Sequence, residues 1–460
     1  MRISETQPKS GYFWLPGHRD RTLPGTLTLK DGGRIELEVL GFLDGRSPFG
    51  DELHIPRIVG LVEQDGYVTL EECFCINWTM SFGGVSKAHF IAHRALLGIS
   101  YDENEPVFLD EFRFSVEGLD EWLGMSGIQA TADFAKKTAT INYVPQDEVV
   151  LRLQNGFQLT FGLSWTLPSS PIVTEAKIAQ KAHIRLTAPN PTPLDGFTSI
   201  AHLITNFLCF ASDETVSINS VSGRMTNSTA KDGEKAEKLD MTIVYQSLPF
   251  AERPPNTKWH TMLFRFPEIR ESAEAMFNAW LNAYEQFQPA LDLYFSARTG
   301  AHRFLNGRFL ALAQAVETLH RRTSSETLFE PVAYEALVAT LVGLCPDAHK
   351  DWLRSKLAYG NEISLATRLR RVTEPFKNLL GPDDERKRVI RRIADTRNYL
   401  THYDDTLVNR AAQDGPDLYQ LCQKLEGILQ LSFFAAVGFS DMQVNSIIKA
   451  NESLRRKLKA

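Results

Sequence analysis

The first half of the chain alternates hydrophobic and polar residues with the period of two that is typical of half-buried β-strands. In GTLTLKDGGRIELEVLGFL, apolar residues alternate on both sides of an Asp31-Gly32-Gly33 turn. In EVVLRLQNGFQLTFGLSW, they alternate on both sides of Asn155-Gly156, which is a strong hairpin signal. Further short runs of this kind, with one helical stretch at 195–212, predict a large antiparallel β assembly that contains a single helix.

From residue 267 onward, apolar residues recur every three or four positions, which is the period of amphipathic helices. The period changes after PFAERPPNTKWH at 249–260, where paired prolines and polar residues interrupt regular structure. The chain is therefore predicted to be an α+β multidomain protein, with antiparallel sheets in its β-rich N-terminal half and an all-α bundle at its C-terminus. We expect a β-rich domain over 1–255, a helical connector over 256–300 and a helical domain over 301–460.

The composition is that of an ordinary globular protein, with 43% hydrophobic and 23% charged residues. The net charge of -6 is unevenly distributed: residues 301–460 carry 24 Lys and Arg against 19 Asp and Glu, whereas residues 1–300 carry 26 against 37. The C-terminal part is the better candidate for meeting an anion, although its bias is smaller than that of strongly basic nucleic-acid binders. Because the N-terminus has no signal-like apolar run and no apolar stretch reaches about 20 residues, we expect a cytoplasmic protein without membrane contact.

The cysteines and histidines give little support for a metal site. Five cysteines are an odd number, which argues against a disulfide framework and for a reducing compartment. Cys73 and Cys75 form a single C-x-C without a second pair at zinc-finger spacing. His89 and His93 have the spacing of two ligands on a helix, but no glutamate follows His89 and no third ligand is evident. We expect no metal and no cofactor.

The segment DDERKRVIRRIADTRNYLTH, at 383–402, predicts a helix whose first turn carries acidic residues suited to the positive end of the helix dipole. Its apolar stripe includes Ile393, and a step of four residues from there leads to Arg397. Asn398 and His402 are also four residues apart, so they lie one above the other on the neighbouring strip. A guanidinium in a packed stripe is costly unless a protein carboxylate or an anionic ligand meets it. This cost is the first indication of a site.

Arg397, Asn398 and His402 have the chemistry needed to cleave RNA without a metal ion. An imidazole can take the proton of a ribose 2′-hydroxyl, or give one to the leaving 5′-oxygen, near neutral pH. The arginine fork matches phosphate oxygens and keeps its charge, and Asn398 can orient the imidazole or the phosphate. The alternative is that His402 is an ordinary packed or solvated histidine and that Arg397 pairs with an internal carboxylate.

The basic residues upstream of this segment can follow an RNA backbone or form a solvated helix face, and both interpretations stay open. An RNA contact would fall on Arg388, Arg391 and Arg392.

The segment RNYLTH resembles the motif of the HEPN superfamily, in which four to six residues separate an arginine from a histidine and Asn, Asp or His commonly follows the arginine. The whole chain resembles the ApeA-type bacterial anti-phage proteins, in which a β-rich N-terminal domain precedes a HEPN domain. The segments that carry this resemblance are GYFWLPGHRDRTLPGTLTLKDGGRIELEVLGFL, IVGLVEQDGYVTLEECFC and RFLALAQAVETLHRR.

The resemblance implies a metal-independent endoribonuclease whose products end in a 2′,3′-cyclic phosphate and a 5′-hydroxyl. It also implies a homodimer or higher homo-oligomer formed through the HEPN domains, with Arg397 and His402 of two subunits in one cleft. In such folds an acidic residue on an earlier helix often holds the motif arginine. Glu317 is the first candidate for that role and Asp395 the second, while a surface carboxylate remains an open interpretation of Glu317.

By the same resemblance, we expect a toxin-like anti-phage defence protein that causes abortive infection. Its helical domain would cleave host or phage RNA. The β-rich domain would restrain the helical domain, or activate it when a phage-derived trigger arrives. Translation-related RNA such as tRNA fits this role. Two alternatives stay open: a non-catalytic HEPN module that only binds partners, and metal-dependent hydrolysis.

Overall fold

The computed structural model describes residues 1–43, 54–168, 170, 174, 176–226, 238–413 and 415–459. The chain divides into two compact units, Met1–Asn278 and Ala279–Ala460. The predicted connector over 256–300 lies across this division, as does helix α4 (Ala273–Ser296).

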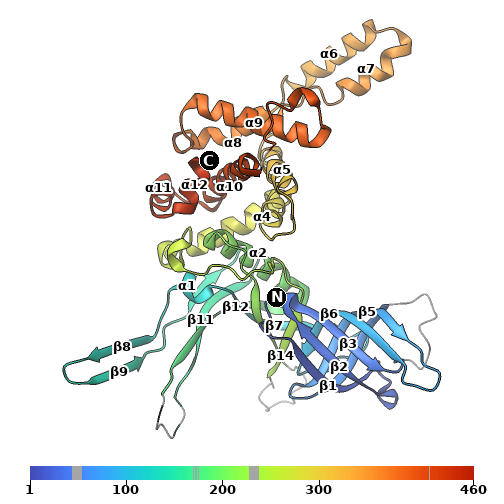
Figure 1. The fold of residues 1–460 in the computed structure, drawn as a ribbon, viewed down its shortest axis with the longest axis vertical. Helices are drawn as coiled ribbons and strands as arrows, with labels where there is room; N and C mark the ends of the chain where they lie inside the picture. Colours follow the sequence, from blue (N-terminus) through green and yellow to red (C-terminus); the bar gives the residue numbers. More distant parts are fainter. Residues whose placement is uncertain are drawn as a thin grey trace. The chain divides into compact units, whose positions relative to one another are not determined.

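The N-terminal unit contains the strands (Figure 1). Their bounds are β1 Gln7–Trp14, β2 Leu23–Lys30, β3 Arg34–Leu40, β4 His54–Val62, β5 Gly66–Thr79, β6 Lys87–Leu97, β7 Phe108–Val116, β8 Ile128–Asp133, β9 Thr138–Tyr143, β10 Val149–Arg152, β11 Gln158–Thr166, β12 Ala179–Pro193, β13 Ile218–Thr226 and β14 Lys238–Tyr245. The helices of this unit are α1 Leu119–Leu123, α2 Leu194–Ser212 and α3 Phe266–Ile269.

The strands pair in antiparallel fashion, as predicted for this half of the chain. Across the described residues, twelve of them form one sheet in the order β10-β11-β12-β7-β13-β14-β6-β3-β2-β1-β4-β5. Because β5 pairs with both β4 and β6, the strands from β1 to β6 close into a ring. Strands β8 and β9 form a separate hairpin.

Both hairpins predicted from the alternating pattern are confirmed. Leu27 of β2 lies opposite Leu37 of β3, and both side chains are buried. Leu151 of β10 lies opposite Leu159 of β11 in the second hairpin. Gly156 turns this hairpin at φ +90°, a conformation that glycine adopts without steric cost. In each hairpin the alternation therefore set the strand register.

Helix α2 is the predicted helix of the N-terminal half, and it packs on β7 and β12. Phe197 stacks on Phe112 with 5.9 Å between ring centroids, and the tilted rings of Phe207 and Phe277 have centroids 4.4 Å apart. Within the described part of the chain, α2 is long and apolar enough to cross a membrane, but 67% of its apolar window is buried in the structure. Burial of that extent is typical of a core helix.

The C-terminal unit is helical beyond α4, as predicted. Its helices are α5 Leu305–Thr323, α6 Pro331–Leu344, α7 Lys350–Leu357, α8 Leu365–Thr373, α9 Asp383–His402, α10 Gly415–Val437, α11 Asp441–Ala450 and α12 Glu452–Lys459. Helix α5 packs against α8, α9 and α10, while α6 and α7 project as a hairpin (Figure 1).

Glu426 of α10 is a charged residue inside this bundle, with 1% of its side chain exposed. Arg298 lies 3.1 Å and Lys457 3.7 Å from its carboxylate, and Arg308 also donates to it. Burial alone would raise the pKa of Glu426, but the three cations together lower it below its ordinary value. The carboxylate therefore joins α10 to the segments that carry these cations.

We expect Glu426→Gln to lower the free energy of unfolding by about 3–5 kcal/mol, because buried cations lose their counter-charge. Since the folded pKa is lowered, the carboxylate stabilises the fold above its ordinary pKa, and that contribution is lost as the pH falls through the lowered value. Thermal unfolding at several pH values would measure both effects. The control is Glu452→Gln at an exposed ion pair; equal stability of the two variants would contradict the prediction.

Candidate active site

Helix α9 presents the motif residues near its C-terminus. It begins after Pro382 with three acidic residues in its first turn and ends at His402, where Tyr403 adopts a φ of +52°. Its fully buried positions include Ile393 and Thr396. The sequence pattern placed Arg397 in the apolar stripe, but Thr396 is the buried residue and the Arg397 side chain is 33% exposed. The arginine therefore lies at the margin of the packed face.

Arg397 is held by a carboxylate from another helix. Its Nη2 donates to Oε2 of Glu317 on α5 at 2.9 Å, and its Nη1 donates to Oδ1 of Asn398 at 3.1 Å. The Glu317 side chain is 15% exposed, so this ion pair is partly shielded from water. Because Arg397 remains partly exposed, an anion in solution can still approach its guanidinium.

Glu317 also belongs to a wider ion network that was not predicted from the sequence. Arg321, one turn along α5, donates to Oε1 of Glu317 at 3.1 Å and also to Glu362. The Arg321 hydrogen bond lowers the pKa of the Glu362 carboxyl. The buried Arg368 of α8 lies 3.6 Å from Glu362. The Glu317-x-x-x-Arg321 spacing on one helix was the available sequence signal.

His402 differs from Arg397 in its surroundings. It is exposed at the end of α9, and no described residue hydrogen-bonds its imidazole. Asn398 lies one turn before His402 on the same strip of α9. Arg397 is rotated from His402 by about 140° around the helix axis. Within one chain, Arg397 therefore faces Glu317 while His402 stays open to a ligand or a second subunit.

The other predicted supporting residues have partners of their own. Asp395, the second residue predicted to hold Arg397, instead lies 2.8 Å from Arg410. In this structure Glu317 holds Arg397, so the prediction for Asp395 is wrong. Of the proposed RNA contacts, Arg392 pairs with Asp417. The remaining two, Arg388 and Arg391, are exposed and have no partner among the described residues.

The histidine pair at the N-terminal end of the chain lies on a strand. His89 and His93 are part of β6, and His89 lies 3.3 Å from Glu38. The helical spacing considered for two metal ligands therefore does not apply. Among the described residues, no group of three or more Asp, Glu, His or Cys side chains is arranged to hold a metal ion.

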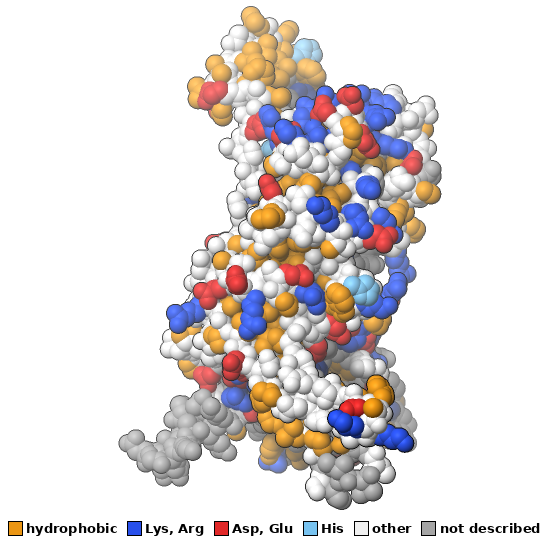
Figure 2. All heavy atoms as spheres, turned by 90° about the vertical axis from the view of Figure 1, so that its left-hand side faces the viewer, with side chains coloured by type: hydrophobic (Ala, Val, Ile, Leu, Met, Phe, Trp, Pro, Cys, Tyr) orange, Lys and Arg blue, Asp and Glu red, His pale blue; other side chains and the backbone are white. Residues whose placement is uncertain are grey.

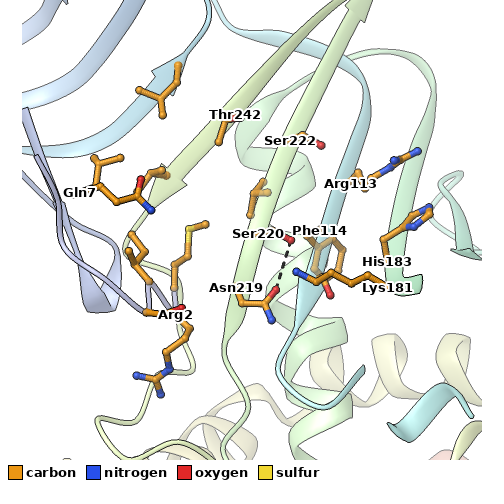
Figure 3. A pocket seen from close by; sticks show the side chains of 18 of the residues that line it. Arg2, Gln7, Arg113, Phe114, Lys181, His183, Asn219, Ser220, Ser222 and Thr242 are labelled. Carbon is orange, nitrogen blue, oxygen red and sulfur yellow. Dashed lines mark hydrogen bonds between the residues drawn. The ribbon is translucent and has the colours of Figure 1, made fainter. Parts of the chain in front are cut away.

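A cavity of about 460 Å³ lies in the N-terminal unit (Figure 3). Arg113 of β7 and Lys181 of β12 line it, and neither has a hydrogen-bond or ion-pair partner among the described residues. Burial lowers the pKa of His183 to about 4, and the positive charges of the nearby Arg113 and Arg185 add to this effect. The imidazole is therefore neutral near pH 7. Its Nδ1 lies 3.2 Å from the Ser164 hydroxyl. Two unpaired cations beside hydroxyl groups can hold an anion.

The helical bundle with an Arg-Asn-x-x-x-His segment at the end of α9 defines a protein with a HEPN domain. Residues 310–443 match the family model of the Apea-like HEPN domain, and residues 8–280 match that of ApeA N-terminal domain 1. Since the second match alone covers more than half of the chain, the chain belongs to the ApeA family. No curated protein and no solved structure matches it.

The family confirms the resemblance drawn from the sequence and makes the helical unit a defence-related HEPN module. HEPN domains are generally ribonucleases, and they commonly dimerise and act on RNA.

Proposed function

We propose that this chain is an anti-phage endoribonuclease that cleaves RNA without a metal ion through Arg397, Asn398 and His402. The observation that carries the proposal is the division of roles along α9. Glu317 fixes Arg397 at 2.9 Å while leaving it partly exposed, and His402 is open and unbonded among the described residues. A cation held in place and a free imidazole are the two groups that phosphodiester cleavage requires.

The proposed reaction is attack of a ribose 2′-oxygen on the adjacent phosphorus. One His402 removes the 2′-hydroxyl proton, and a proton is delivered to the 5′-oxygen as the P–O5′ bond breaks. Arg397 stabilises the charge that develops on the phosphorane oxygens, and Asn398 orients the phosphate or the imidazole. The products are a 2′,3′-cyclic phosphate and a 5′-hydroxyl. Arg388 and Arg391, about three to four helical turns before His402, would then contact the RNA backbone away from the cut.

We further propose that two copies complete the site. In one chain, Arg397 and His402 point in directions about 140° apart around α9, so a second copy of α9 can supply the facing histidine. A homodimer or higher homo-oligomer then provides one imidazole as the base and another as the acid.

We assign the N-terminal unit the task of restraining the nuclease until a phage-derived trigger arrives in the bacterial cytoplasm. An uncontrolled ribonuclease would harm its host, and host or phage RNA, including tRNA, would be exposed to it. The unpaired Arg113 and Lys181 in the cavity of Figure 3 support a trigger that carries an anionic group.

The direct test of the proposal is to incubate the full chain with total bacterial RNA in EDTA and to determine the chemistry of the fragment ends. Cyclic-phosphate and 5′-hydroxyl ends support the metal-free mechanism, whereas cleavage that stops in EDTA would support metal-dependent hydrolysis. An extract of phage-infected cells is the second substrate, because it contains phage RNA together with other phage-derived components. No cleavage under either condition would favour the non-catalytic module.

The alternative, a HEPN module that only binds partners, predicts that Arg397 and His402 are both buried with their donors satisfied internally. Arg397 fits this in part, because Glu317 and Asn398 accept two of its N–H groups. The exposed His402 fits the nuclease and also the solvated histidine of the alternative, so the cleavage assay decides between them.

Glu317 acts in this proposal as a positioning residue for Arg397. We expect Glu317→Ala to lower the cleavage rate about 100-fold, because a small displacement of the guanidinium misaligns it with the phosphate. Glu317→Gln keeps an acceptor for Arg397 and should restore most of the rate, which a purely electrostatic role would not allow. Single-turnover kinetics measures the chemical step, and the control is Glu374→Ala at an exposed ion pair with Lys377. Full activity of Glu317→Ala would contradict this role.

A further inference from the structure

Helix α6 is apolar on all sides and yet exposed on nearly all sides. Its sequence, PVAYEALVATLVGL, contains Glu335 as its charged residue, and Val342 is its buried position. The side chain of Val332 is 70% exposed and that of Leu344 is 81% exposed. A helix that is apolar around its whole circumference is normally covered by other protein. The exposure of α6 therefore indicates a surface that is covered when the protein acts.

The α6–α7 hairpin makes few contacts with the remainder of its own unit. Helix α6 packs on α7, and the hydroxyl of Tyr334 donates to the carbonyl of Leu357 at 2.7 Å. The base of the hairpin is closed by hydrogen bonds between Phe329 and Asn361. Figure 2 shows hydrophobic side chains gathered over this hairpin at the top of the view, and Trp352 of α7 is also largely exposed. Two helices of this length do not enclose a core of their own.

The same hairpin contains a groove with a volume of about 740 Å³. Its apolar lining comes from Tyr334, Val338 and Val342 of α6 and from Leu357 of α7. On a different side of α6, Leu337, Leu341 and Leu344 form an exposed ridge with the spacing i, i+4, i+7. A ridge of this spacing is what an apolar groove accepts.

We propose that the α6–α7 hairpin is an interface through which two copies of this chain associate. In a two-fold interface each copy presents the same patch, so the leucine ridge of one hairpin enters the groove of the other and the contact is repeated in reverse. Two helices from each copy then form a four-helix core, which buries surfaces that a single hairpin cannot bury.

The charges of the hairpin are compatible with a second copy of the chain as its partner. Helix α6 carries Glu335 and no cation, whereas α7 carries Lys350, Arg354 and Lys356 against one carboxylate, Asp351. When α6 of one copy lies beside α7 of the other, the acidic and basic helices attract one another. Within one hairpin Lys350 pairs with Asp347 and Arg354 with Asp351, so Lys356, which has no partner among the described residues, is the cation left for Glu335 of the second copy.

This interface lies outside α9 and goes beyond the proposed pairing of the motif residues. It does not depend on RNA cleavage. If the wild-type chain cleaves no RNA but the hairpin variants still dissociate, the proposed function fails and the interface stands.

The test is sedimentation equilibrium of the full chain and of two variants, the double variant Leu337→Glu/Leu341→Glu and the single variant Leu344→Glu. We expect the wild type to self-associate and each variant to weaken association at least about tenfold, because glutamates would be buried against leucine. Leu344 is so exposed that its replacement leaves the fold intact, which circular dichroism would verify. The matched control is Met442→Glu, an equally exposed apolar position on α11.

Two results would overturn the interface. A monomeric wild type at tens of micromolar, or variants that associate as tightly as the wild type, would show that second copies do not cover the hairpin. Co-sedimentation of the wild type with anionic phospholipid vesicles, lost in the variants without any change in self-association, would assign the hairpin to a membrane surface instead.

Discussion

His402→Ala should abolish RNA cleavage and anti-phage protection while leaving the protein folded. His402 is the titratable group closest in sequence to Arg397 that is both exposed and unbonded among the described residues, and a proton-transfer group contributes about 10²–10⁴-fold to such reactions. Because no described residue hydrogen-bonds the imidazole, its removal costs little stability. The loss of activity would therefore be chemical rather than structural.

The measurement is single-turnover cleavage of total RNA together with phage plaque counts on cells that express the wild type or the variant. His18→Ala, at an exposed histidine of the N-terminal unit, is the control and should behave as the wild type. A His402→Ala strain that remains fully protected would reject the nuclease and favour the non-catalytic HEPN module.

Arg397→Ala should lower the cleavage rate about 10²–10³-fold, the cost of removing one preorganised donor to a developing oxyanion. Arg397→Lys should recover little of this loss. The guanidinium donates to Glu317 and to Asn398 through separate nitrogens and still has an exposed portion, whereas an ammonium is a single point charge. A lysine at this position can meet the carboxylate or the phosphate, but it does not hold both.

The control is Arg410→Ala, because Arg410 lies after α9 and pairs with Asp395 of that helix. Comparing its rate with those of the two Arg397 variants would separate a local role of Arg397 from a general loss of positive charge. Equal losses in Arg397→Ala and Arg410→Ala, with full activity of the charge-conserving Arg397→Lys, would show that the net charge of the unit, rather than the geometry of Arg397, supports the activity. A fully active Arg397→Lys would show that a point charge is sufficient.

Much of the fold was predictable because it depends on local periodicity. The β2–β3 and β10–β11 hairpins follow from alternation of period two around glycine-containing turns, and α9 follows from its acidic first turn and its apolar spacing. The motif residues were predictable for the same reason, since Arg397, Asn398 and His402 lie within six residues of one helix. Glu317 was identified as a candidate only through the family resemblance.

Long-range contacts were not predictable from these patterns. The choice between Glu317 and Asp395 as the partner of Arg397 was made by the packing of α5 against α9, which brings together residues 80 positions apart. The closure of the strand ring depends on the pairing of β3 with β6 and of β1 with β4, which lie far apart in the sequence. The position of His89 and His93 on β6 depends on the same β3–β6 pairing.

Alternation and helical spacing along the chain are thus sufficient to specify the β-rich and helical halves and the three motif residues, because side-chain direction in a strand or helix is a local property. Packing in three dimensions decided which carboxylate meets Arg397, that His402 is left open, and that the apolar α6 stands uncovered on one copy. All three features depend on which surfaces are left exposed after the cores have formed. Local periodicity does not specify which surfaces those are.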